Sequence, residues 1–142
     1  MSRHTIHRFM TSTPHTITTR QTLAEAHQAM RERGVRHLPV VEDGKLVGVV
    51  SQRDLYLLET LRGVDVGREL VEEAMSDAPF VVGPDAPLEE VAEVMANRKH
   101  GSALVVERST VVGIFTSTDA LRALVSLLRQ AGPGTDGDDA GR

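Results

Sequence analysis

The chain has 142 residues, 40% of them apolar and 25% charged, and its formal net charge at pH 7 is −4. It contains no cysteine, which excludes disulfides, thiol nucleophiles and cysteine-ligated zinc. The acidic balance provides no general electrostatic field that would attract nucleic acid or an anionic membrane. Aromatic residues make up only 3% of the chain, so its core must be built from aliphatic side chains and methionine.

We expect neither a signal peptide nor a membrane span. The first ten residues are polar and lack an apolar h-region. The longest apolar runs, such as residues 46–50, are far too short to cross a bilayer. These features predict a soluble, cytoplasmic protein with no membrane partner and with a mobile N-terminus. The segment over residues 132–142 is rich in Gly and Asp, which predicts a disordered tail.

The first half of the chain predicts a strand, a helix, two strands and a second helix. Residues 16–18 are a short extended segment, and residues 22–33 place Leu23 and Met30 on one apolar helical stripe. Gly34 is expected to end this helix, because glycine readily takes the left-handed backbone angles found after a last helical turn.

Two Val-rich strands follow, over residues 38–42 and 45–50. They are separated by Asp43-Gly44, a strong signal for a two-residue hairpin whose central residues both have positive φ. Ser51 is expected to begin the second helix, which continues to about residue 61.

The second half repeats this order after a linker helix that we expect over residues 65–74. Pro87 is expected in the first turn of the helix that it begins. Arg108-Ser109 replaces Asp-Gly in the second hairpin, so we expect a turn of a different type there. The strands and helices of this half are predicted at residues 80–82, 87–98, 103–107, 110–115 and 116–129.

The two halves are related by an offset of sixty-five residues without a gap. Over the forty-seven pairs from 10/75 to 56/121, twelve are identical, whereas roughly three would match by chance at ordinary composition. A repeat of this length contains a full set of secondary-structure elements. It therefore predicts two related half-domains with a cleft between them. The identical pairs include Met10/Met75, Leu23/Leu88, Val47/Val112, Gly48/Gly113 and Asp54/Asp119.

The segments from His37 to Asp54 and from Gly101 to Asp119 resemble the CBS (cystathionine β-synthase) domain. The resemblance covers residues 8–125 and includes, in each copy, a Met-Thr/Ser-x-x-Pro lead-in, a Val-Gly-Val/Ile strand and a Ser/Thr-x-x-Asp motif. It implies an α/β (α+β) fold of two β-α-β-β-α repeats, packed sheet to sheet with pseudo-twofold symmetry. We expect the first repeat in residues 1–65, the linker helix and second repeat in residues 66–131, and the tail in residues 132–142.

The resemblance also implies a Bateman module, which is a regulatory unit and not an enzyme. Such modules commonly bind AMP, ADP, ATP or a ligand like S-adenosylmethionine between their repeats. By resemblance, Asp54 and Asp119 are candidates to bind a ribose, and the hydroxyl and N–H groups near Ser51 and Thr116 are candidates to meet phosphate. The same residues also fit a purely structural role, in which Ser51 and Thr116 cap helices and each Asp occupies the third helical position.

Cationic residues differ between the two copies. By resemblance, residues at the strand entry and within the Ser/Thr-x-x-Asp motif approach phosphate. We therefore expect the site of Asp54 to be the more cationic and to prefer the more highly phosphorylated ligand, and the site of Asp119 to be smaller and more neutral. The candidate contacts are Arg36, His37 and Arg53 in the first copy and the aligned Gly101, Ser102 and Thr118 in the second.

With so few aromatic residues, we expect an adenine ring to lie between aliphatic side chains. The candidates by position are Ile17, Val82, Val35 and Leu38, all of which also suit a hydrophobic core. The chain has no HExxH motif, no Gly-rich phosphate loop and no arguable Ser–His–Asp set. We therefore expect no metal, no cofactor and no catalysis, and a nucleotide would act as a regulatory ligand.

The family resemblance implies a homodimer formed by the helices that follow the strands. Leu121, Leu124, Val125 and Leu128 form an apolar stripe suited to that role, although the stripe could instead pack within the monomer. We expect an effector protein to read the ligand-bound arrangement in trans. One alternative is a protein-interaction module whose clefts bind nothing. Another is nucleic-acid binding by a local arginine patch, which the acidic balance and the lack of stacking aromatics disfavour.

Overall fold

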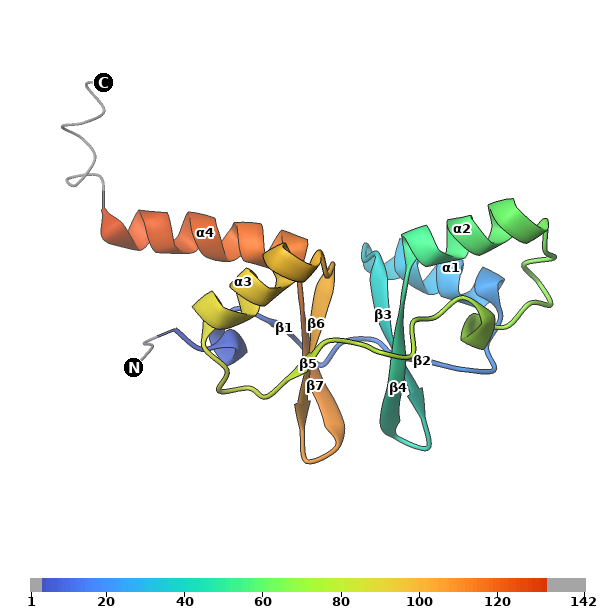
Figure 1. The fold of residues 1–142 in the computed structure, drawn as a ribbon, viewed down its shortest axis with the longest axis horizontal. Coiled ribbons are helices and arrows are strands. Elements are labelled where there is room, and N and C mark those ends of the chain that lie inside the picture. The colour runs from blue at the N-terminus through green and yellow to red at the C-terminus, as the bar shows by residue number, and fades with distance from the viewer. Residues whose placement is uncertain (1–3, 133–142) are drawn as a thin grey trace, which may run out of the picture.

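The computed structural model describes residues 4–132. Two sheets face each other at the centre of the molecule, and the helices lie on their outer sides (Figure 1). This arrangement confirms the predicted mixed fold of two related halves packed sheet to sheet. The predicted disorder of the tail concerns residues 133–142, which lie outside the described part of the chain.

The first half contains a sheet with the strand order β2 (Ile17–Thr18), β3 (His37–Glu42) and β4 (Lys45–Ser51). β2 is parallel to β3, and β3 and β4 form an antiparallel hairpin. Helices α1 (Leu23–Arg33) and α2 (Gln52–Arg62) cover the outer face of this sheet. All five elements lie where the sequence pattern predicts them, to within one residue at either end.

The second half repeats this layout with β5 (Val81–Val82), α3 (Leu88–Arg98), β6 (Ser102–Glu107), β7 (Thr110–Thr116) and α4 (Ser117–Ala131). Pro87 is the N-cap of α3 and does not lie in its first turn as expected. None of the helices within residues 4–132 is long and apolar enough to cross a membrane.

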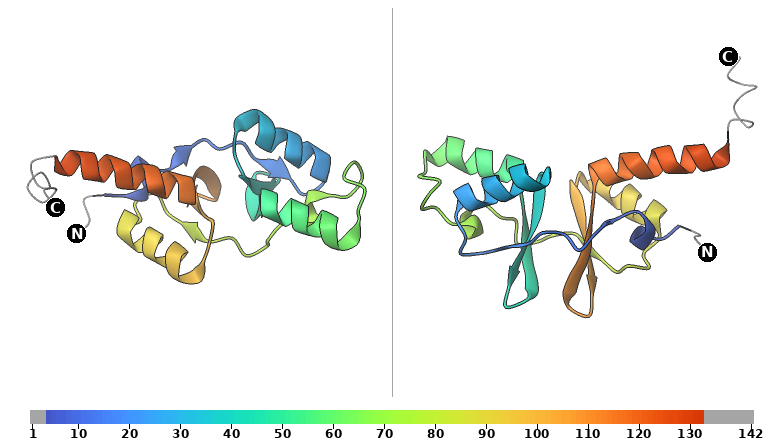
Figure 2. Two further views of the ribbon diagram at one scale, coloured as in Figure 1. Left: turned by 90° about the horizontal axis from the view of Figure 1, so that it is seen from above. Right: turned by 180° about the vertical axis from the view of Figure 1, so that it is seen from behind.

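The segment that precedes each half packs on the opposite half. β1 (Thr11–Ser12), which the sequence pattern does not predict, pairs with β7 and places Thr11 opposite Ile114. The equivalent residue Ser76 pairs with Val49 at the edge of the first sheet. Both segments therefore run across to the opposite half (Figure 2), and backbone hydrogen bonds as well as side chains join the two halves.

A short 3₁₀ helix precedes each of these pairings, η1 (Ile6–Arg8) in the first segment and η2 (Val71–Glu73) in the second. Ile6 and Val71 are both completely buried, Ile6 in the core of the second half and Val71 in the core of the first. These two residues are related by the same sixty-five-residue offset. The structural repeat therefore extends back at least to Ile6, four residues before the Met10/Met75 pair at which the aligned block begins.

Two predictions about these segments are wrong. The N-terminus was expected to be mobile, but the backbone N–H of Ile6 donates to the carbonyl of Ala86 at 2.8 Å, and residues 4–10 are ordered against the second half. The linker was expected to be helical over residues 65–74, but only Val71–Glu73 is helical there. Its carbonyls at Val66 and Glu69 instead accept hydrogen bonds from the first turn of α1, which competes with helical pairing.

Each half has its own hydrophobic core, built mainly from aliphatic side chains and methionine as the composition requires. Complete burial of one Leu, Ile or Val side chain contributes roughly 1.5–3 kcal/mol, so a single residue from the opposite lead-in is a sizeable part of a small core. The first core contains Ile17, Leu23, Ala26, Met30, Leu38, Val40, Val50, Leu55 and Val71. The second contains Ile6, Leu88, Val91, Met95, Ala103, Val105, Phe115 and Ala123.

The repeated methionine of each lead-in packs against the repeated glycine of the opposite half. A Cβ on Gly48 would lie 3.0 Å from Sδ of Met75 and 2.5 Å from the backbone oxygen of Ser76. A Cβ on Gly113 would collide in the same way with the side chain of Met10. The glycine in each Val-Gly step therefore makes room for the lead-in of the opposite half.

The two hairpins have the same kind of turn, which corrects the expected difference. Asp43 and Gly44 have φ of 53° and 80°, and Arg108 and Ser109 have φ of 53° and 68°. Positive φ at both central residues is the requirement of the two-residue turn that matches the twist of the flanking strands. The strand pairing therefore imposes this geometry in the second hairpin although neither central residue is glycine.

Candidate functional site

Two clefts open where the halves meet, one beside each repeated aspartate. The Asp54 cleft has a volume of about 700 Å³ and the Asp119 cleft a volume of about 620 Å³. Small-molecule sites in proteins commonly have volumes of roughly 300–1,000 Å³, so either cleft is large enough for one.

The structure distributes the predicted site residues between these clefts. Arg36 and His37 line both of them, and Ile17 and Val82 line neither, because they pack in or against the two cores. The Asp54 cleft brings together Ser51, Arg53, Asp54, Gly101 and Ser102. The Asp119 cleft brings together Val35, Leu38, Thr116, Thr118 and Asp119.

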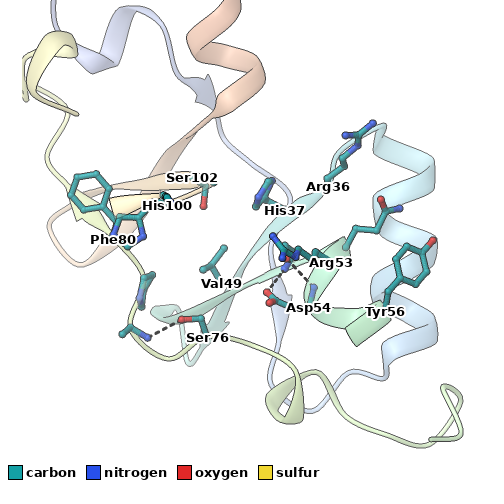
Figure 3. A pocket seen from close by; sticks show the side chains of 16 residues that line it. Arg36, His37, Val49, Arg53, Asp54, Tyr56, Ser76, Phe80, His100 and Ser102 are labelled. Carbon is teal, nitrogen blue, oxygen red and sulfur yellow. Dashed lines mark hydrogen bonds between the residues drawn. The ribbon is translucent and has the colours of Figure 1, made fainter. Parts of the chain in front are cut away.

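Asp54 caps the start of α2 and keeps one oxygen open. The backbone N–H of Ser51 donates to Oδ2 of Asp54 at 2.9 Å, and the backbone N–H of Asp54 donates to Oγ of Ser51 at 3.0 Å (Figure 3). This capping box confirms the structural interpretation of the first Ser/Thr-x-x-Asp motif. Oδ1 of Asp54 accepts no hydrogen bond from any residue within 4–132, and the side chain is only half-buried, so a ligand can reach this oxygen.

Asp119 caps α4 in the same way, with the backbone N–H of Thr116 donating to its Oδ2 at 2.9 Å. Unlike Asp54, it is buried, with 6% of its surface exposed. The hydroxyl of Thr11 also donates to this carboxylate and lies 3.1 Å from Oδ1 and 3.3 Å from Oδ2. Both oxygens of Asp119 are therefore engaged within the protein, and a ribose would have to displace Thr11.

The residue equivalent to Thr11 makes no such contact in the Asp54 cleft. Ser76 is exposed, and its Oγ accepts a hydrogen bond from the backbone N–H of Ala78 at 3.4 Å. The two clefts therefore differ in how available their carboxylates are. Pairwise alignment of the repeats gives no sign of this difference, because Thr and Ser are chemically alike and only their partners differ.

The expected contrast in charge between the clefts is wrong. Arg36, Arg53 and Lys99 line the Asp54 cleft, and Arg33, Arg36 and Arg122 line the Asp119 cleft. The first-copy residue Arg36 lies where the halves meet and reaches both clefts. In addition, α4 supplies Arg122, which lies just beyond the aligned part of the repeat. Each cleft is thus lined by three permanent cations.

The Asp54 cleft also contains an aromatic pair that sequence reasoning missed. The rings of Phe80 and His100 are stacked, with centroids 5.2 Å apart and planes inclined by 17°. They lie on the wall opposite Asp54 (Figure 3). A flat ligand in this cleft therefore meets aromatic faces as well as the expected aliphatic side chains. The sequence contains one sign of this aromatic pair: the residue after the lead-in proline is His15 in the first copy but Phe80 in the second.

His37 lies between the clefts at the start of β3. A Cβ on Gly101 would come within 2.9 Å of Nε2 of His37, so the ring packs directly against the backbone of the second half. Burial lowers the pKa of His37 below its usual 6.5, while Asp54 acts to raise it and Arg36 to lower it. The neutral imidazole therefore predominates at pH 7, and Arg36 is the permanent charge at this junction.

Sequence comparison gives consistent matches to one family. The CBS domain profile matches residues 6–58 and 71–126. Inosine-5′-monophosphate dehydrogenase of Korarchaeum cryptofilum is 33% identical over 128 residues, which cover 89% of this chain but only 24% of the dehydrogenase. The CBS domain-containing protein YhcV of Bacillus subtilis is 34% identical over 110 residues, or 78% of each chain. The chain thus spans about a quarter of the first relative and most of the second.

Solved structures show the same arrangement of two repeats. AcuB of Vibrio cholerae, assigned to acetoin utilization, superposes with a TM-score of 0.81 at 34% identity, covering 89% of this chain and 93% of AcuB. CBSX2 in complex with AMP has a TM-score of 0.75 at 30% identity and covers 87% and 98% of the two chains. The CBS domain pair of protein MJ0100, in complex with 5′-methylthioadenosine and S-adenosyl-L-methionine, has a TM-score of 0.78 at 26% identity and covers 87% and 97%.

Proposed function

Because the chain belongs to the CBS domain family, we propose that it is a regulatory module that binds an adenosine-containing ligand between its two repeats. Two similar CBS pairs support the ligand class, since CBSX2 was solved with AMP and MJ0100 with 5′-methylthioadenosine and S-adenosyl-L-methionine. The single observation that carries the proposal is the open oxygen of Asp54, inside a cleft that also holds cations and an aromatic pair.

The parts of the Asp54 cleft correspond to the parts of a nucleotide. Oδ1 of Asp54 accepts hydrogen bonds from the ribose hydroxyls, which a half-buried carboxylate with an open oxygen is suited to do. Arg53 and Lys99 meet the phosphate. The outer face of the Phe80–His100 stack receives the base, where an aromatic contact adds to simple burial.

The Asp119 cleft is the weaker of two sites in this proposal. Its volume and its cations are adequate, but the carboxylate already accepts a hydrogen bond from Thr11. A ligand that displaces Thr11 exchanges one hydrogen bond for another and gains little from it. The Asp54 cleft is therefore filled first.

The proposed output is the relative arrangement of the two halves, which an effector protein reads in trans. The effector contacts a homodimer that forms through α2 and α4. The exposure of the α4 stripe supports this part of the proposal, since Leu121 and Leu128 are 64% and 63% exposed and do not pack into the cores formed by residues 4–132. A cytoplasmic location, expected from the composition, belongs to the same proposal.

Thermal unfolding of the wild type, Asp54→Asn and Asp119→Asn with AMP, ATP or S-adenosylmethionine tests the ligand site. Asparagine retains an acceptor for the capping hydrogen bond but removes the carboxylate, so both variants lose a similar amount of capping. A ligand present at a hundred times its dissociation constant stabilises by about 2.7 kcal/mol. We expect this stabilisation in the wild type and in Asp119→Asn, and a clearly smaller one in Asp54→Asn, where only the weaker Asp119 cleft binds.

A module that only binds proteins predicts a different result. In that case the two aspartates serve only as helix caps, a role that both already fill. Neither variant would then change the response to any adenosyl ligand, because none of the three proteins would respond. That outcome would replace nucleotide sensing by the protein-interaction function.

A further inference from the structure

The junction between the two clefts is built from residues of unequal size. The repeat aligns Arg36 with Gly101 and His37 with Ser102. His37 packs against the backbone of Gly101, where any side chain would collide with the ring, and Ser102 is buried beside the Asp54 cleft. The large side chains of the first half therefore occupy space that the small residues of the second half leave open. This complementarity brings one arginine and one histidine into contact with both clefts.

Arg36 is fixed at its backbone and free at its side chain. Its carbonyl accepts a hydrogen bond at 2.9 Å from the backbone N–H of Gln52, the first residue of α2. Its side chain is exposed and forms no hydrogen bond or ion pair with another residue in the described part of the chain. The guanidinium can therefore turn toward either cleft without breaking a contact.

The other cations are not shared in this way. Arg53 and Lys99 line only the Asp54 cleft, and Arg33 and Arg122 line only the Asp119 cleft. Each cleft thus has two cations of its own and one that it shares with the other cleft. A third cation that serves two sites makes the charge of each site depend on what occupies the other.

We propose that Arg36 couples the two clefts, so that a phosphorylated ligand in the Asp54 cleft weakens the binding of a second phosphorylated ligand in the Asp119 cleft. The coupling rests on the proposed function, because it requires both clefts to accept nucleotides. Arg36 turns toward the first phosphate and is no longer available to the second.

The size of the effect follows from the exposure of Arg36. Coupling between sites commonly changes affinity by about 5-fold to 150-fold, and water screens an exposed charge. We therefore expect a value near the lower limit, about fivefold. By reciprocity, a ligand held in the Asp119 cleft weakens the Asp54 cleft by the same factor.

Calorimetric titration with AMP tests this proposal in the full chain. The wild type gives the affinity of the Asp119 cleft when the Asp54 cleft is already filled, and Asp54→Asn gives the affinity of the Asp119 cleft alone. We expect binding to this cleft to be about fivefold tighter in Asp54→Asn. The same pair of measurements in an Arg36→Ala background is expected to give a ratio near one, and this second pair cancels any direct effect of the Asp54 substitution.

Two controls separate a shared charge from a general change of shape. Arg53→Ala weakens the Asp54 cleft but leaves the fivefold ratio in place, because Arg53 lines one cleft only. Titration with 5′-methylthioadenosine, which has no phosphate, gives a ratio near one even in the wild type. A ratio of one for AMP in the wild type, or a ratio that Arg36→Ala leaves unchanged, would overturn the coupling while nucleotide binding stands. Absence of AMP binding in every variant would instead remove the proposed function and the coupling with it.

Discussion

Thr11 and Asp119 are 108 positions apart in the chain, yet the hydroxyl of Thr11 donates a hydrogen bond to the Asp119 carboxylate. The contact joins the lead-in of the first half to the first turn of α4 in the second half. It places a structural task and a candidate ligand-binding task on the same carboxylate. Asp54, the equivalent residue, also caps its helix, but Ser76 does not bond to it, so its second oxygen stays open to a ligand.

Replacing Thr11 by valine, which keeps its shape, is expected to lower the free energy of unfolding by about 1–2 kcal/mol, because a hydrogen bond to a charged group is lost. Urea unfolding measures this change. Ser12→Ala, at the exposed neighbouring position of β1, serves as the control and should change stability by less than about 0.5 kcal/mol. In an Asp54→Asn background, Thr11→Val should also tighten AMP binding in the Asp119 cleft. An unchanged unfolding free energy would show that the hydrogen bond contributes nothing.

Gly48→Ala is expected to destabilise the protein by about 1–3 kcal/mol, because the added methyl group meets the backbone oxygen of Ser76 as well as Met75. Gly83→Ala is a matched control, since a Cβ there has no neighbour within 4 Å. In the second half, Met10→Ala should partly rescue Gly113→Ala, because the obstacle there is a flexible side chain. Additive losses in the double variant would contradict direct contact between Met10 and Gly113.

The buried position of His37 predicts a pH dependence of stability. Burial lowers its pKa below 6.5 in the folded protein, so the unfolded chain takes up a proton more readily as the pH falls past that value. Stability is therefore lost as the pH falls below 6.5, down to the folded pKa, and is regained as the pH rises through the same window. Unfolding free energies of the wild type and His37→Gln, measured between about pH 5 and 8, should differ in slope, with the variant flatter. Parallel curves would assign the slope to other groups.

The second hairpin holds a non-glycine pair in left-handed geometry, which predicts that it can be improved. Ser109→Gly should raise the free energy of unfolding by about 0.5–1 kcal/mol. A left-handed conformation costs a residue with a side chain roughly 1–2 kcal/mol. Glycine avoids this cost, but it loses more conformational entropy on folding, which offsets part of the gain. The reciprocal change in the first hairpin, Gly44→Ser, should lower it by a similar amount. Urea midpoints at constant slope check both variants. A shift in the same direction for the two would show that turn geometry does not govern them.

The exposed stripe on α4 predicts dimerisation. Leu124 is 52% exposed, and Leu124→Glu should convert a dimer to a monomer in sedimentation experiments at micromolar concentration, because a charge in an apolar interface must lose its hydration. Val81→Glu places the same charge on the edge strand β5, where 46% of the valine is exposed, and should leave the dimer intact. A wild type that sediments as a monomer would end the dimer hypothesis.

Local patterns in the sequence are enough to place most of the secondary structure. The apolar stripe of α1, Gly34 after its last turn, and Asp43-Gly44 between β3 and β4 each act within a few residues. The motifs beginning at Ser51 and Thr116 also predict their helix caps, because a capping box is a local contact. These features depend on neighbours along the chain and not on the rest of the fold.

The features that were missed depend on contacts between the halves. β1 exists only because β7 pairs with it, and the linker is not helical because its carbonyls accept hydrogen bonds from the start of α1. The sequence does not predict the charge of the Asp119 cleft for the same reason. Alignment of the repeats places Arg36 in its own copy, whereas the fold places it beside both clefts.

The exchange of lead-ins has a consequence for how the chain comes to be folded. Ile6 is synthesised before residues 88–123, which make the core that buries it. The first half, in turn, cannot close its own core until Val71 has been synthesised. The first half can therefore close only after residue 71 has been made, and the apolar segment around Ile6 stays exposed to capture by another chain until the second half follows. The interlocked halves form a single cooperative unit, and its folding is completed only after Ala123 has been synthesised.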